Sequence, residues 1–468
     1  MKDKLLLPIK SIKAKYIPLL IVYFTTGLSG LAAVTSTIFF KDTVSLTPEQ
    51  LITLGVYVGL PWSVKMIFGS LIDSVKLFGN NRKSYIYLGQ LLVFLGTMGY
   101  IDHTTNQYLM GMLGEYTALL LTGLTTTIGV VMSDVVADVM AIELVPEDDP
   151  NREKSLGMVQ VLSRLAIMLG ALIGAFLTGY LASNVEPYLV YTIELLCPTL
   201  AIIATFLSKI NFEPETGVVN KQLLLGGLGY GLVTIFAGML GGTELVFLIS
   251  ISILIYMLRS LLVKSFDPKM IKPFVYAMLA IFLFRVVPGV GPAGAWWYMN
   301  ELGFDADFMG TLRIVSAITG FVVLFFLADS ITNHSIFKTM SVLIGMVTVL
   351  SLPDILIFYN LTMGIDPRTL VLVDTAMIGP LANLSMIPLG VLVAKHAPAM
   401  ERAAYVSLTA SLMNISLVGG DIITKWLNQI FIVTREDFTQ MGSLMIWSLI
   451  ISTVLSIIGL VILKLKGK

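Results

Sequence analysis

Long apolar stretches separated by short polar segments recur along the whole chain. About 20 consecutive apolar residues let an α-helix cross the roughly 30 Å hydrocarbon core of a bilayer. The pattern therefore predicts an all-α integral membrane protein with about 14 transmembrane helices. The expected spans are approximately 16–40, 50–72, 84–104, 113–142, 155–182, 187–208, 221–241, 243–263, 270–298, 306–328, 337–358, 368–394, 402–427 and 441–463.

Two segments in the two halves of the chain share the same order of features. In each, a polar loop and an acidic helix start precede a hydrophobic helix that ends in Asp-Ser, at Asp73-Ser74 and again at Asp329-Ser330. Because the expected orientation is the same both times, the pattern indicates a parallel repeat of six helices plus six, the arrangement of major facilitator transporters. The alternative is a chance similarity of two amphipathic hairpins.

The expected domains follow from this repeat. Residues 1–209 are predicted to form an N-terminal six-helix bundle, and residues 269–468 a C-terminal six-helix bundle. The segment 210–268 is predicted to be a linker that carries an extra pair of transmembrane helices, joined at Gly241-Gly242. These two stretches also fit a single re-entrant hairpin, so a smaller number of full spans stays an alternative.

The distribution of basic residues predicts the orientation. With the N-terminus in the cytoplasm, most of the 30 Lys and Arg residues fall on cytoplasmic segments, including Arg82, Lys83 and the C-terminal lysines. This bias is typical of cytoplasmic loops and places both termini inside. The apolar stretch 16–40 is too long for the core of a signal peptide and is interpreted as the first, uncleaved span. The short loops suit a bacterial inner membrane.

Composition and charge exclude several other classes of protein. Hydrophobic residues make up 56% of the chain and charged residues 13%, far from the balance of a soluble domain. Acidic and basic residues are equal in number, so no basic surface for nucleic acid is expected. One cysteine and three scattered histidines form no metal-ligand pattern. No nucleotide-binding loop is present, so we expect no cofactor and no ATP-driven transport by this chain alone.

Several motifs occur in order along the chain and carry a family resemblance. They include Leu60-Pro61-Trp62-Ser63-Val64-Lys65, then Gly69-Ser70-Leu71-Ile72-Asp73, and Asn300-Glu301-Leu302-Gly303-Phe304 in the second half. The chain resembles the folate–biopterin transporter family of the major facilitator superfamily. The resemblance implies transport of folates, biopterin or related pteridines, and of S-adenosylmethionine in some members. Met66 stands where the family usually has proline, and such departures affect the substrate more than the fold.

Charged side chains inside apolar spans are costly, so each is a candidate functional residue. Asp134 and Asp138 are four residues apart and share one helix face. Arg164 lies at the same expected depth on the next, antiparallel span, where the opposite charges would offset each other's desolvation. Two carboxylates with one cation leave one carboxylate that can exchange a proton with substrate or water. Proton coupling and a purely structural network are the two interpretations.

Six residues are candidate substrate contacts. Lys65 and Arg285 lie near mid-span, where a cation suits an anionic substrate. Trp296 follows the helix-breaking run Pro288-Gly289-Val290-Gly291-Pro292 and is placed to stack on a flat ring, or else belongs to an aromatic belt at the interface. Asp374 suits the donors of an aminopyrimidine ring, with an interfacial carboxylate as the alternative. Asn383 and Tyr23 are further candidates near mid-span, and Tyr23 is also interpreted as a core tyrosine.

Three further residues are expected to act in gating at the cytoplasmic face. Asp73 and Arg82 bracket the turn between the second and third spans and resemble the superfamily's signature at this turn. A carboxylate and a guanidinium group can form hydrogen bonds that break when a transporter opens inward. Asp329 is the equivalent residue of the repeat. Asp421 and Lys425, four residues apart, are expected to form a local ion pair.

The leading hypothesis is a secondary active transporter that moves a small organic anion by alternating access, with proton coupling left open. The protein is expected to work as a monomer in the bilayer. Alternatives within the superfamily are transporters of S-adenosylmethionine, muropeptides or pigment-related molecules. A membrane-embedded lipid enzyme is the alternative from another class, but no acidic metal site or nucleophile arrangement in the sequence supports it.

Overall fold

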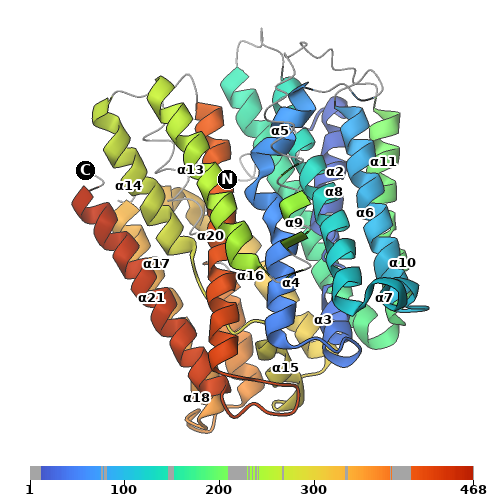
Figure 1. Cartoon of the computed structure of the whole chain (residues 1–468), viewed down its shortest axis with the longest axis vertical. Helices are drawn as coiled ribbons and strands as arrows, with labels where there is room; N and C mark the ends of the chain where they lie inside the picture. The colour runs from blue at the N-terminus through green and yellow to red at the C-terminus, as the bar shows by residue number, and fades with distance from the viewer. Residues whose placement is uncertain are drawn as a thin grey trace. The chain divides into compact units, whose positions relative to one another are not determined.

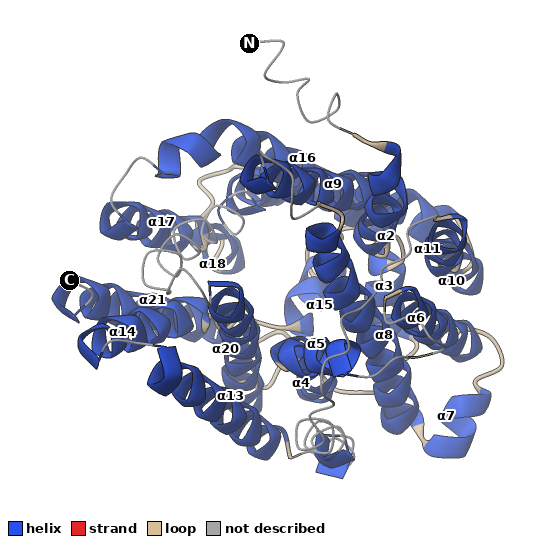
Figure 2. Ribbon diagram, turned by 90° about the horizontal axis from the view of Figure 1, so that it is seen from above, coloured by secondary structure: helices blue, strands red, loops and turns tan. Residues whose placement is uncertain are grey.

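The computed structural model describes residues 12–74, 77, 82–145, 152–208, 229, 232–234, 236–237, 240, 242–265, 268–332, 336–379, 381 and 402–466. Within these ranges the regular structure is helical and contains no strand (Figure 2). Eight helices among the described residues are long and apolar enough to cross a membrane. The all-α membrane architecture is therefore confirmed, whereas the expected count of about 14 spans stays a prediction.

The chain divides into two units, and residues distant in sequence contribute to each. The first consists of Met1–Asp42 and Lys65–Leu232, and the second of Thr43–Val64 and Val233–Lys468. Figure 1 identifies the helices of both units by label. The segment 43–64 thus packs with helices of the second half of the chain, although it lies in the first half of the sequence.

The first unit is built around two pairs of closely packed helices, α6 with α8 and α2 with α9. Glycines bring α2 and α9 together: a Cβ atom on Gly27 would overlap the carbonyl oxygen of Ile167, and one on Gly170 that of Phe24. Small residues let membrane helices approach in this way. The elements are η1 (Ala14–Tyr16), α2 (Ile17–Leu28), α3 (Ala33–Asp42), α5 (Lys65–Ser74), α6 (Lys83–His103), α7 (Tyr108–Leu113), α8 (Glu115–Glu143), α9 (Arg152–Asn184), α10 (Pro187–Glu194) and α11 (Leu196–Leu207).

In the second unit, α4 packs chiefly against α20, and α14 against α21. Figure 2 shows α14 beside α21 and α13 beside α20. A buried apolar cluster that includes Phe274, Ile281 and Met340 forms part of its core. The elements are α4 (Pro48–Ser63), α13 (Thr243–Ser265), α14 (Pro268–Arg285), α15 (Pro292–Asn300), α16 (Ala306–Thr332), α17 (Ile336–Leu350), α18 (Leu352–Phe358), a helix over residues 367–379, α20 (Arg402–Ile430) and α21 (Met441–Lys466).

The stretch 50–72, expected as one span, is two helices that belong to different units. A capping box starts α4: the Thr47 hydroxyl accepts from the Gln50 amide at 3.2 Å, and the Gln50 side chain accepts from the Thr47 amide at 2.9 Å. Pro61 lies inside the last turn of α4. The helix ends at Ser63, and the next residue, Val64, is not helical. The new helix α5 then begins at Lys65.

The predicted break after Arg285 is confirmed. Residues 286–290 are not helical, and Gly291 has a φ of 66°, which favours glycine. The Gly289 amide donates to the Thr424 hydroxyl at 2.9 Å, and its carbonyl accepts from Ser448 at 2.9 Å. Side chains of α20 and α21 therefore satisfy backbone groups that the broken helix leaves free, as an apolar environment requires.

The helix that the sequence places between the two bundles, α13, is tied to the second unit by an ion pair between a buried lysine and a partly exposed glutamate. Lys425 of α20 binds Glu244 at 2.8 Å and also donates to the Thr243 hydroxyl. The Trp426 indole donates to the same carboxylate at 2.9 Å. The expected local pair between Lys425 and Asp421 was wrong, because the more distant carboxylate of Glu244 meets the ammonium group first.

Candidate functional site

A network of charged and polar side chains lies inside the first unit. Lys65, the first residue of α5, forms ion pairs with Asp134 and Asp138 of α8, the latter at 2.9 Å between Nζ and Oδ2. The Tyr23 hydroxyl of α2 donates to the other oxygen of Asp138 at 2.9 Å. Three helices thus contribute to one cluster, and one ammonium group bridges two carboxylates.

The positions of these residues follow from local structure. Asp134 and Asp138 are one helical turn apart on α8, so both can face the same neighbour. Helix α5 packs against α8, and the break at Val64 sets Lys65 at the start of α5. Tyr23 is buried where α2 approaches α8.

The two carboxylates differ in their access to solvent. The Asp134 side chain is 14% exposed and that of Lys65 is 21% exposed, whereas that of Asp138 is 49% exposed. When both carboxylates are ionised, the group of three carries one negative charge in excess. Asp138, on the more exposed side, is the carboxylate placed to accept a hydrogen bond from a ligand.

The structure brings together four residues that the sequence assigned to two separate roles. Tyr23 and Lys65, expected as substrate contacts, join the acidic pair Asp134 and Asp138. Arg164 of α9, the expected partner of that pair, has an exposed side chain. Among the described residues no direct ion pair joins it to either carboxylate, although its charge acts on Asp134 through space.

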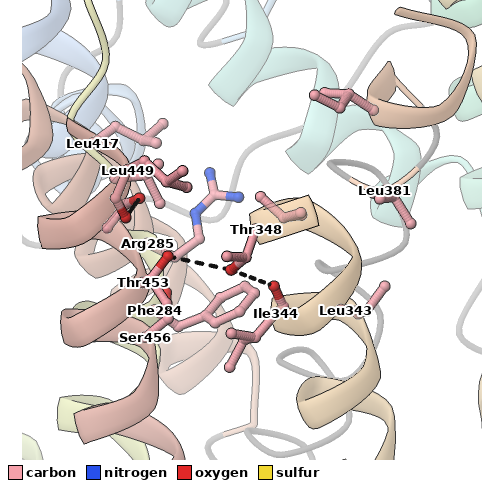
Figure 3. Close-up of a pocket in the computed structure, with 14 residues that line it drawn as sticks. Phe284, Arg285, Leu343, Ile344, Thr348, Leu381, Leu417, Leu449, Thr453 and Ser456 are labelled. Carbon is pink, nitrogen blue, oxygen red and sulfur yellow. Dashed lines mark hydrogen bonds between the residues drawn. The ribbon is translucent and has the colours of Figure 1, made fainter. Parts of the chain in front are cut away.

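The second unit contains a cavity of about 250 Å³ with Arg285 in its wall (Figure 3). Its lining comes from α14, α17, α20, α21 and residues 378 and 381, and it is largely aliphatic. Arg285 is the last residue of α14, directly before the break. Its Nε atom is buried, and no hydrogen-bond partner for it occurs among the residues that the structure describes. Within that part of the chain, a cation without a counter-ion therefore borders an apolar space.

Trp296 of α15 is covered by protein in this structure. Its side chain is 1% exposed, and the guanidinium carbon of Arg435 lies 4.4 Å from the centre of the ring. Arg435 also donates to the carbonyl oxygens of Val44 and Leu46, the latter at 3.1 Å, and so joins the α20–α21 loop to the segment before α4. Stacking of Trp296 on a substrate ring stays a prediction.

A second acidic group in the same unit combines the predicted residue Asp374 with Tyr298 and Asp354, which the sequence analysis missed. The Tyr298 hydroxyl lies 2.7 and 2.8 Å from the two oxygens of Asp354, and Asp374 lies near enough to interact electrostatically with both residues. One oxygen of Asp374 is buried without a hydrogen-bond partner. The sequence feature that could have revealed this group is Asp354, a carboxylate within the apolar stretch 337–358.

The remaining candidates are described only in part. Arg82 lies at the N-cap of α6 and is 7% exposed. Asp73 and Asp329 lie on α5 and α16, but their side chains are outside the described part of the structure. Asn383 is outside the described residues altogether. The gating role of the first three residues and the substrate role of Asn383 stay predictions.

Comparisons with known proteins agree with this architecture. The model of the BT1 family matches residues 26–466. The chain is 26% identical to a folate-biopterin transporter of Synechocystis sp., over 92% of this chain and 77% of that protein. It is 22% identical to the probable folate-biopterin transporter 4 of Arabidopsis thaliana, over 90% and 89%, respectively. It is also 22% identical to folate transporter 2 of Plasmodium falciparum, over 83% and 75%.

Solved structures with a similar fold are also transporters. A POT family transporter in complex with 5-aminolevulinic acid superposes with a TM-score of 0.69 at 15% identity, over 98% of this chain and 99% of that one. The nucleoside transporter NupG superposes with a TM-score of 0.65 at 12% identity, over 96% and 99%. At these identities the similarity establishes the fold, which is the major facilitator fold expected from the sequence.

Proposed function

The chain belongs to the BT1 family, and we propose that it carries a pteridine-type organic solute, such as a folate or biopterin, across its membrane. The names of the curated relatives support this solute class. The observation that carries a transport function is the network of Lys65, Asp134, Asp138 and Tyr23 within a bundle of apolar helices.

The composition of the network favours a functional role over a purely structural one. Ionisable groups at membrane depth are expensive and mark substrate or ion pathways. A structural pair needs one carboxylate for Lys65, and the buried Asp134 already supplies it. Asp138 is then in excess, and its side chain is half-exposed. A surplus carboxylate with access to solvent is suited to binding a proton or a hydrogen-bond donor of the solute.

We propose that Asp138 couples proton binding to transport. With Asp138 ionised, the Lys65 ammonium group is shared between two carboxylates. With Asp138 protonated, the ammonium group pairs with Asp134 alone and the network is neutral. The two states differ in charge and in the position of Lys65, which is what a proton-driven change between inward-open and outward-open forms requires. A network that only holds α5 against α8 is the alternative.

The proposal also assigns a gate, a contact with the pteridine ring and a membrane orientation. Asp73, Arg82 and Asp329 are assigned to a gate at the cytoplasmic face, because their turns carry the transporter-like repeat. Asp374, with its buried unpaired oxygen, is assigned to the amino groups of the pteridine ring. The protein is proposed to act as a monomer in a bacterial inner membrane, with both termini in the cytoplasm.

Uptake into proteoliposomes tests the proposal. The purified full-length protein is reconstituted, and entry of labelled folate, biopterin and S-adenosylmethionine is measured with and without an inward proton gradient. Saturable uptake of a pteridine that the gradient accelerates is expected. Asp138→Asn should abolish the acceleration, whereas the matched change Asp437→Asn, in the exposed loop before α21, should leave it intact.

The same vesicles distinguish the alternatives. Uptake of S-adenosylmethionine alone would assign a different solute to the same fold. Chemical conversion of a lipid or solute without net entry would indicate an enzyme. If correctly folded protein takes up none of the three solutes, the proposed solute class is wrong.

A further inference from the structure

The cavity around Arg285 has a mostly aliphatic wall with few polar groups, and Arg285 is its one charged lining residue among those described. Most of its wall consists of aliphatic side chains such as Val287, Leu343 and Leu449. The polar side chains are hydroxyls from α17 and α21, and Arg285 provides the charge. Figure 3 marks the hydrogen bond between the Thr348 and Thr453 hydroxyls and the one from Thr348 to the Ile344 carbonyl.

The hydroxyl hydrogens are largely used within the protein. Thr348 donates to the Ile344 carbonyl at 2.8 Å and shares a 3.2 Å hydrogen bond with Thr453. Ser452 donates to the Leu449 carbonyl at 3.0 Å. The guanidinium group of Arg285 is therefore the main donor that this wall can offer to a ligand.

The charge of Arg285 is not balanced by a carboxylate in the part of the chain that is described. Its Nε is buried and without a partner. An unpaired cation that borders an apolar space is costly, and an anion bound beside it recovers part of that cost through charge-assisted hydrogen bonds. The planar guanidinium group of an arginine can form two parallel hydrogen bonds with one carboxylate.

From these observations, we infer that the cavity binds the carboxylate end of a ligand whose adjoining part is apolar or aromatic, with Arg285 as its counter-ion. An apolar cavity of about 150 Å³ can bind a benzene ring, so this cavity of about 250 Å³ has room for one ring or short chain with its carboxylate. The cavity is partly open, so the rest of a longer ligand can lie outside it.

The inference rests on the proposed function only where it identifies this ligand as the transported solute. In that case Arg285 selects pteridines that carry a carboxylate tail over those without one. Folate, which ends in a glutamate, depends on the cavity, whereas biopterin, which has no carboxylate, does not. The selectivity of one transporter between two solutes of the same class would then be decided by a single arginine.

Binding to the purified full-length protein in lipid nanodiscs tests this. The probes are labelled folate, biopterin and p-aminobenzoyl-glutamate, which has the carboxylate tail but no pteridine ring. Arg285→Gln is expected to weaken binding of folate and p-aminobenzoyl-glutamate at least tenfold and that of biopterin less than twofold. Arg285→Lys, which keeps the charge but loses the planar fork, should fall between the wild type and Arg285→Gln. Arg313→Gln, on α16 and outside the cavity wall, is the matched control.

A second variant keeps the test decisive if Arg285→Gln does not fold. Ser452→Phe fills the cavity from α21, and the hydroxyl that it removes bonds only within its own helix. It should also weaken binding of the two carboxylates. If both variants bind p-aminobenzoyl-glutamate as the wild type does, or if biopterin weakens equally with folate, the inference is overturned.

The outcomes separate the inference from the proposed function. Arg285-dependent binding of p-aminobenzoyl-glutamate without binding or uptake of any pteridine supports the cavity assignment and refutes the solute class. Pteridine uptake that is indifferent to Arg285 and to Ser452→Phe supports the solute class and refutes the cavity assignment. If folded wild-type protein binds none of the probes, both are refuted.

Discussion

Replacing Lys65 by methionine removes the cation that contacts both Asp134 and Asp138 while keeping a side chain of similar length. Asp134 is 14% exposed and is then left without its direct counter-charge, beside a second carboxylate one turn away. Removing one partner of a buried ion pair typically costs about 3–5 kcal/mol of folding free energy. Asp138 is half-exposed, so its lost pairing should add less than about 1 kcal/mol. We therefore expect Lys65→Met to lower the free energy of unfolding by about 3 kcal/mol.

A double-mutant cycle isolates the interaction that causes this loss. Asp134→Asn removes the charge that Lys65→Met leaves unpaired, so the double variant should be more stable than Lys65→Met alone. The coupling between the two substitutions should be at least about 1 kcal/mol, within the range for contacting residues. Stability is measured by reversible unfolding in mixed detergent micelles, followed by circular dichroism. Strictly additive effects of the two substitutions would refute the role assigned to this ion pair.

Three further predictions concern proton coupling, the packing of α2 on α9 and the attachment of α13. Asp138→Asn should retain exchange of labelled for unlabelled solute across the vesicle membrane but lose acceleration by a proton gradient; equal loss of both would show that Asp138 serves binding rather than coupling. Gly170→Val should sharply reduce the yield of folded protein because its Cβ would overlap a carbonyl of α2, whereas Gly55→Ala, with open space around its Cβ, should not. The yield of folded, detergent-solubilised protein is measured by size-exclusion chromatography, and equal yields of the two variants would contradict this prediction. Lys425→Met should destabilise the protein by about 1 kcal/mol, because the Glu244 carboxylate that it leaves unpaired is 38% exposed. Adding Glu244→Gln should restore part of the loss in the same unfolding assay, a result that would not occur if α13 were held by apolar packing alone.

The helical fold could be predicted from the sequence because the bilayer leaves few options. Every backbone amide and carbonyl must be satisfied within an apolar stretch, so each such stretch becomes a helix. The break after Arg285 was also predictable, since two prolines and two glycines within five residues remove donors and permit a positive φ. The end of α4 was not predicted, because a single proline, Pro61, within a mostly apolar stretch does not by itself show whether a helix kinks or ends.

The membership of the charge network was predictable only in part. Counting residues from helix ends predicts how deep a side chain lies, and this placed Arg164 level with Asp134. Depth does not determine the direction in which a side chain points around its helix. The Arg164 side chain is exposed, and Lys65 rather than Arg164 forms the ion pair with Asp134. The same limitation explains Lys425, for which the nearest carboxylate in sequence was not the nearest in space.

Lys65, which belongs to the charge network, is also the residue at which the chain enters the first unit. The chain passes from the second unit to the first between Val64 and Lys65, directly after the end of α4. On the α4 side, the Trp62 carbonyl accepts from Asn414 of α20 at 3.0 Å, which fixes the last turn of α4 to the second unit. On the α5 side, the ammonium group of Lys65 is held by α8 of the first unit. If Asp138 takes up a proton as proposed, its release from Lys65 acts three residues from an anchored backbone, with only Val64 between the two helices. If the network drives transport, lengthening this junction by one glycine after Val64 should uncouple uptake from the proton gradient while leaving the ion pair intact.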